Sequence, residues 1–78
     1  MSPKAKSVLS SVVARSGMSK AELSRSMGKN GNYLSVVLNR GSVPQADTFS
    51  MIADASGYDM LVRRRDTGEE ILIDPPEK

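Results

Sequence analysis

Apolar positions recur with a helical period as far as Gly57 and with the alternation of a strand after it. The first apolar stripe follows Ser2 and Pro3, which suit an N-cap and a first helical position. Gly17 comes soon after the stripe ends. This pattern predicts a first helix over residues 3–15, with an inner face made of Val8, Leu9, Val12 and Val13.

A capping box predicts the second helix. Ser19 is followed three residues later by Glu22, so each side chain can accept the backbone N–H of the other. Leu23 and Met27 then lie one turn apart and supply a buried face. Gly28 is suited to the left-handed conformation that ends many helices, so the helix should stop there.

The segment KNGNYLSVVLNRG, residues 29–41, gives two opposite signals. Asn30-Gly31 is typical of a two-residue hairpin turn, whereas Leu34, Val37 and Leu38 have the spacing of one helix face. A strand here would need a partner, and both upstream segments have helical patterns. We therefore expect a third helix over about 31–39, with Asn30 as its N-cap and Gly41 closing it.

Pro44 and Gln45 lead into a predicted fourth helix that ends at Gly57. Asp47 falls in its first turn, where the helix dipole favours a carboxylate. Its inward face is predicted to be Phe49, Ile52 and Ala53.

The period then changes to that of a β-hairpin, DMLVRRR-DTG-EEILID. A three-residue loop with Gly68 in the left-handed position would pair Arg65 with Glu69, Arg64 with Glu70, Val62 with Leu72, and Leu61 with Ile73. The predicted fold is mainly α, with a four-helix unit over residues 1–57. A C-terminal hairpin follows over residues 58–74, and a flexible tail over residues 75–78.

The 78 residues include no cysteine and no histidine. Disulfides, Cys/His zinc sites and histidine-based catalytic triads are therefore excluded, and we expect no enzyme activity and no cofactor. With so few aromatic residues, a stacking platform for RNA is not expected either. No stretch resembles a membrane span or a signal peptide, so a cytoplasmic, nucleoid-associated location is expected.

The charge is unevenly divided. Residues 1–45 carry seven basic residues and one acidic residue, whereas residues 46–78 carry four basic and eight acidic residues. A solvated surface with an accidental gradient would give this pattern too. A basic half and an acidic half otherwise indicate that one side of the domain meets a polyanion.

Two short helices joined by a tight turn suggest a helix-turn-helix. Here GMSKAELSRSMGKNGNYLSVVLNRG, followed by VPQADTFSMIADASG, resembles the lambda-repressor-like helix-turn-helix family, also called the xenobiotic-response-element type. The resemblance covers roughly residues 17–57. The chain departs from the family pattern at three positions: Ser24 replaces a usual Ala, Lys29 a usual apolar residue, and Lys20 a frequent Gln.

The resemblance implies two sets of DNA contacts on and around the third helix. Asn32 either pairs with adenine or helps to cap the helix, and Tyr33 either contacts DNA or lies along the first helix. Base reading is implied for Gly31, Asn32, Tyr33, Ser35 and Val36. Phosphate contact is implied for Lys20, Lys29, Asn39 and Arg40, with Lys4 and Lys6 as weaker candidates.

These features predict a DNA-binding transcriptional regulator of bacterial or phage type, a repressor acting as a homodimer on a palindromic operator. The expected dimer contact is the hairpin, through Leu61, Val62, Ile71, Leu72 and Ile73. The run Arg63 to Arg65 either pairs with Glu69 and Glu70 or adds a second nucleic-acid contact. The alternative is an antitoxin-like or phage accessory module whose acidic hairpin binds a protein partner such as a toxin.

Overall fold

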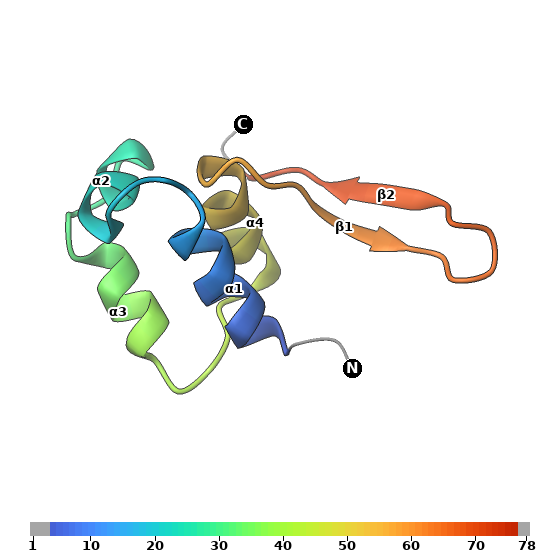
Figure 1. The fold of residues 1–78 in the computed structure, drawn as a ribbon, viewed down its shortest axis with the longest axis horizontal. Coiled ribbons are helices and arrows are strands. Elements are labelled where there is room, and N and C mark those ends of the chain that lie inside the picture. Colours follow the sequence, from blue (N-terminus) through green and yellow to red (C-terminus); the bar gives the residue numbers. More distant parts are fainter. Residues whose placement is uncertain (1–3, 77–78) are drawn as a thin grey trace.

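The computed structural model describes residues 4–76, which form four helices followed by a two-stranded antiparallel hairpin (Figure 1). The predicted mainly helical class is thus confirmed. The predicted start of the first helix at residue 3 is wrong, because the helix begins at Ala5 with the extended Lys4 as its N-cap; Ser2 and Pro3 themselves lie outside the described residues. No helix in residues 4–76 has the length and apolar character to cross a membrane. The elements are α1 (Ala5–Ala14), α2 (Lys20–Ser26), α3 (Tyr33–Asn39), α4 (Ala46–Ala55), β1 (Met60–Arg63) and β2 (Glu70–Ile73).

The core lies where the inner stripes of the four helices meet. Leu23, Leu34 and Ile52 are fully buried, one each from α2, α3 and α4. Burying a side chain of this size contributes about 1.5–3 kcal/mol each, so this small core can hold the helices together. The seven members of the cluster are Leu9, Val13, Leu23, Leu34, Val37, Phe49 and Ile52.

The local signals at the ends of α2 are confirmed. The Ser19 hydroxyl accepts the backbone N–H of Glu22, and the Glu22 carboxylate accepts that of Ser19, both at 3.1 Å. The backbone N–H of Ser19, and after it the Ser19 hydroxyl, act on the Glu22 carboxylate and hold its pKa below its ordinary value. Gly28 follows α2 with φ of +75°, as predicted.

The predicted C-terminal end of α3 at residue 39 is confirmed, whereas the helix starts two residues later than predicted. Its N-cap is Asn32 and not Asn30; the Asn30 side chain instead accepts the Asn32 N–H at 3.1 Å. At the other end, Arg40 is an extended C-cap with φ of −69° and ψ of 151°. The chain therefore leaves α3 before Gly41, which does not close the helix.

The predicted hairpin register is also wrong. The structure pairs Met60 with Ile73, Leu61 with Leu72, Val62 with Ile71, and Arg63 with Glu70. Arg64 donates its N–H to Glu69 at 2.7 Å, which leaves a four-residue loop in place of the predicted three. Gly68 has φ of +79° and donates to the Arg64 carbonyl at 2.9 Å, while the Arg64 side chain pairs with Asp66 and not with Glu70.

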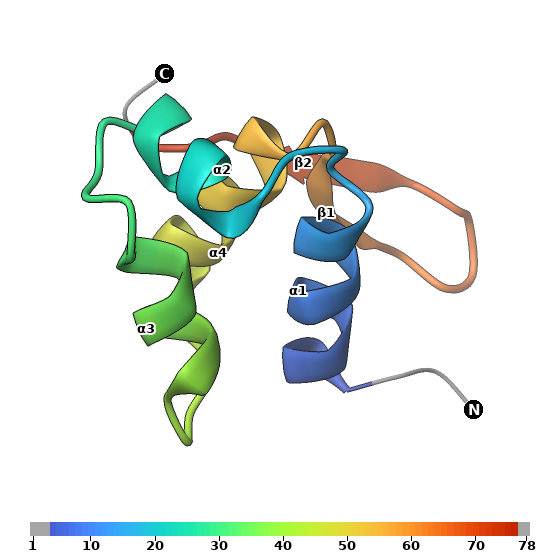
Figure 2. The same ribbon diagram turned by 60° about the vertical axis from the view of Figure 1, so that its left-hand side comes forward.

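The hairpin projects from the helical part of the molecule beyond α4 (Figure 1). It leaves on the side of α1 opposite to α3, so α3 and the hairpin occupy different ends of the molecule (Figures 1 and 2). The elongated shape, 41 × 28 × 22 Å, reflects this projection. Of the predicted tail, residues 77–78 lie outside the described part, and Pro75 is half-buried.

Candidate nucleic-acid interface

The connection from α2 to α3 is held by backbone hydrogen bonds. Gly28 donates to the Arg25 carbonyl at 2.9 Å and Lys29 to the Ser24 carbonyl at 3.0 Å, so the chain turns sharply after α2. Tyr33 then donates to the Asn30 carbonyl at 3.0 Å, which begins the next helix. Lys29, the departure from the family pattern in this turn, thus has its backbone N–H satisfied.

Ser24 joins the two helices directly. Its hydroxyl donates to the Lys20 carbonyl at 2.7 Å and accepts the Leu34 N–H at 3.0 Å, and the residue is fully buried. The first N–H groups of a helix have no partner within the helix, and Asn32 provides no side-chain cap. Ser24 therefore caps α3 from within α2, a role that alanine could not fill.

The outer side of α3 is uncovered by any other element in the views of Figures 1 and 2. Helical spacing places Ser35, Val36 and Asn39 along it, and the two caps, Asn32 and Arg40, flank them. Asn32, Asn39 and Arg40 are exposed, and Ser35 is half-buried. Val36 lies near the middle and is 49% exposed. We call this the outer stripe of α3: Asn32, Ser35, Val36, Asn39 and Arg40.

Gly31 lies beneath the side chain of Arg25. A Cβ at this glycine would meet the Arg25 guanidinium at 2.9 Å, so the missing side chain gives the guanidinium room over the start of α3. Arg25 was not predicted as a site residue. Its charge was visible in the sequence, but its position beside Gly31 depends on how α2 meets the turn.

Tyr33 and Lys29 do not belong to the outer stripe of α3, although Tyr33 shares a depression with Arg40. Tyr33 is half-buried against the core, and it lines a shallow depression with Pro44, Gln45 and Thr48. The Lys29 ammonium sits 5.6 Å from the centroid of the Tyr33 ring, a cation–π distance. Tyr33 therefore leans toward the start of α4, not along α1.

Lys20 and Asn39 are brought together although they lie far apart in the sequence. Both line one depression between the start of α2 and the end of α3. At the same end of α3, the Lys6 ammonium donates to the Arg40 carbonyl, which ties α1 to α3. Lys6, Lys20 and Arg40 thus concentrate positive charge around the C-terminal end of α3.

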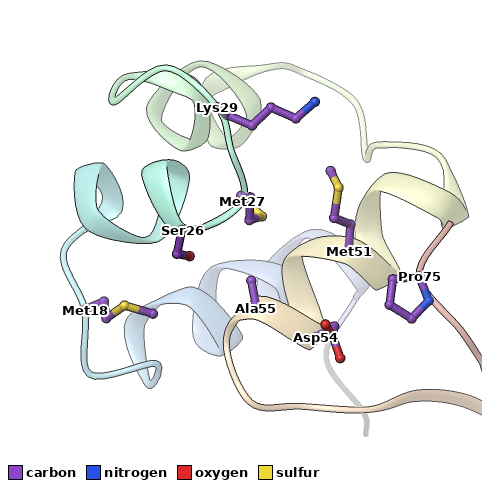
Figure 3. Close-up of a pocket in the computed structure, with 8 residues that line it drawn as sticks. All are labelled: Met18, Ser26, Met27, Lys29, Met51, Asp54, Ala55 and Pro75. Atoms are coloured by element: carbon purple, nitrogen blue, oxygen red, sulfur yellow. The ribbon is translucent and has the colours of Figure 1, made fainter. Parts of the chain in front are cut away.

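A methionine-lined pocket of about 690 Å³ opens behind the turn (Figure 3). Met27 and Met51 lie between Lys29 and Asp54, and Met18 lies at the far side (Figure 3). Met18 and Met27 pack partly against the core. The pocket therefore extends the core surface and contains no stripe residue.

The predicted dimer residues are largely exposed. Val62, Ile71 and Leu72 are 56%, 62% and 58% exposed, and Leu61 is 37% exposed. Ile73 is half-buried opposite Met60, which packs against the core. The outer part of the hairpin thus carries apolar side chains that nothing within residues 4–76 covers.

Comparison of the chain with protein-family models, with curated proteins and with solved structures gave no match.

Proposed function

We propose that the protein is a sequence-specific double-stranded DNA-binding transcriptional regulator that reads bases with α3. The observation that carries the proposal is the outer stripe of α3, a row of short or polar side chains on an uncovered helix with cations at one end. An α-helix fits the major groove of B-DNA, and short side chains let it approach the base edges closely.

Each member of the stripe has a chemistry suited to this task. Asn32 has an exposed carboxamide that makes no cap bond, so it is available to pair with adenine N6 and N7. Val36 presents methyl groups that suit a thymine methyl, and Ser35 can bond to several bases. Gly31 keeps the helix entrance free of a side chain and leaves that space to the Arg25 guanidinium.

The surrounding cations suit phosphate. Lys20 and Asn39 border one depression, and Arg40 and Lys6 meet at the end of α3. Contacts of this kind fix the orientation of a helix on DNA and supply most of its salt-dependent affinity. The Lys29 ammonium lies over the Tyr33 ring. We propose that this pair stabilises the turn before α3 and contacts DNA at most through a phosphate at the edge of the interface.

A single α3 spans few base pairs, so useful affinity requires two of them. We propose a homodimer on a palindromic operator, with half-sites about one helical turn apart, and repression by competition for promoter DNA. The expected location is the cytoplasm, at the nucleoid.

Titration of fluorescent random-sequence duplexes tests the proposal at its simplest level. Binding should weaken steeply as salt rises, because each neutralised phosphate releases counterions. Arg40→Glu should weaken it further, whereas the exposed control Arg64→Glu on the hairpin should not. Equal effects of the two charge reversals would contradict the proposed surface.

A further inference from the structure

An apolar groove of about 780 Å³ lies between α1, α4 and the start of β1. Its lining includes Val8 and Val12 of α1, Phe49 of α4, and Val43. Leu61, on β1, completes the lining. Val43 and Tyr58, which also lines the groove, are 41% and 39% exposed, so apolar surface continues from the groove to the outside.

The observed register divides the hairpin side chains between two faces. Leu61 and Leu72 lie opposite each other, followed on the same face by Arg63 and Glu70. Val62 and Ile71 lie on the other face. Met60 and Leu61 belong to opposite faces, and both line the groove. Met60 packs against the core, whereas Leu61 is 37% exposed, so the apolar surface of the groove continues to the outside of the hairpin through the Leu61–Leu72 face.

We propose that the groove binds the Leu61–Leu72 face of the hairpin of a second copy, and that the contact is reciprocal. A two-fold axis beside Leu61 would place each hairpin over the groove of the other copy, because groove and hairpin meet at that residue. The hairpin projects away from the four helices (Figure 1).

Charge complementarity favours a second copy as the occupant. Arg15 and Asp59 line the groove, and Arg63 and Glu70 lie on the hairpin face next to the leucines. In the two-fold arrangement Glu70 of one copy can meet Arg15 of the other, and Arg63 can meet Asp59. Such rim pairs contribute little affinity, but they fix the register of a contact.

The low stability of an isolated hairpin also favours a second copy as the occupant of the groove. A two-stranded hairpin is marginal in water by itself, and this one exposes two pairs of large apolar side chains. The proposed contact covers one pair and fills the groove. It identifies the dimer contact of the proposed function, on which it rests for its biological role, and it leaves α3 uncovered on the opposite side of α1.

Sedimentation of the full chain without DNA tests the proposal. The wild type should be a dimer at micromolar concentration. Leu72→Asp on the hairpin and Val43→Asp on the groove should each weaken it at least about tenfold, as expected for loss of a buried apolar anchor. Val62→Asp is the matched control on the other hairpin face and should leave the dimer intact. A monomeric wild type, or Val62→Asp weakening the dimer as much as Leu72→Asp, would overturn the proposal.

Disulfide trapping tests the groove contact specifically, since the chain has no native cysteine. Mixed Ser11→Cys and Glu70→Cys chains should form a mixed disulfide on mild oxidation, because Ser11 lines the groove. Ser35→Cys mixed with Glu70→Cys is the control and should not. Equal trapping in both mixtures, or none in the first, would overturn the groove contact. Neither experiment contains DNA, so its failure is distinct from a failure to bind DNA.

Discussion

The Ser24 hydroxyl accepts the backbone N–H of Leu34 at 3.0 Å while donating to the Lys20 carbonyl at 2.7 Å. One buried side chain thus links the first turn of α2 to the first turn of α3. The link fixes the position of α3 relative to α2, and therefore the direction in which its outer stripe faces.

Ser24→Ala should lower the free energy of unfolding by about 1–3 kcal/mol, because it leaves the buried Leu34 N–H without an acceptor. Urea denaturation measures the loss. Ser26→Ala is the matched control in the same helix, since the Ser26 hydroxyl only donates to the Leu23 carbonyl and its loss leaves no N–H unpaired. Equal losses in the two variants would show that the link to Leu34 contributes nothing.

The capping box should make stability depend on pH. The pKa of Glu22 is lowered in the folded state, so its stabilising contribution is complete above the unfolded pKa, near 4.5, and disappears as pH falls through the folded pKa. Glu22→Gln should therefore be less stable than wild type at neutral pH, and the difference should shrink in acid. Denaturation between neutral pH and about pH 3 measures it.

The control for this prediction is the same substitution in a Ser19→Ala background. Both hydrogen bonds that lower the pKa involve Ser19, although its backbone N–H is retained in that variant. The pH dependence should then become smaller without vanishing. A difference between Glu22→Gln and wild type that stays constant with pH would contradict the assignment.

The sequence was most informative where a signal was local. Ser19 and Glu22 specify their own helix start, and the apolar spacing around Leu34 correctly overrode the turn signal of Asn30-Gly31. The hairpin register was missed because a shift of one residue still sets an arginine against Glu70 and apolar against apolar. The four-residue loop instead carries bonds from the Arg64 side chain to Asp66 and from the Glu69 N–H to Thr67, which the alternation of the strands does not predict.

Among the candidate site residues, too, local spacing predicts some positions, whereas others depend on the packing of separate elements. The helical members of the outer stripe of α3, Ser35, Val36 and Asn39, follow from helical spacing, and four of the five stripe residues are exposed. The positions of Arg25 over Gly31 and of Tyr33 toward α4 depend on how separate elements pack. No spacing within one helix carries that information.

Asn32→Ala should alter base preference at one position of the DNA site and cost about 1–3 kcal/mol there. Stability should change little, because Asn32 is exposed and makes no side-chain cap bond. Binding measured on a panel of single-base variants of the preferred site checks the result. A uniform loss on every sequence would remove Asn32 from the base-reading residues.

Lys20→Ala should weaken binding to all sequences alike and reduce the salt slope by about one unit, as expected for one lost phosphate contact. Affinity measured at several salt concentrations gives the slope. Lys4→Ala is the comparison variant, because Lys4 is exposed and does not line the depression that Lys20 shares with Asn39. An unchanged slope in Lys20→Ala would place that ammonium away from phosphate.

Selection of bound DNA from a random duplex library tests the central claim most directly, because it reports activity, sequence preference and symmetry together. Enrichment of two inverted half-sites about one helical turn apart is expected, with the preferred base at one position of each half-site lost for Asn32→Ala. A library that stays random after repeated selection, or the same enriched sequence from a chain altered at both Asn32 and Val36, would contradict base reading by α3.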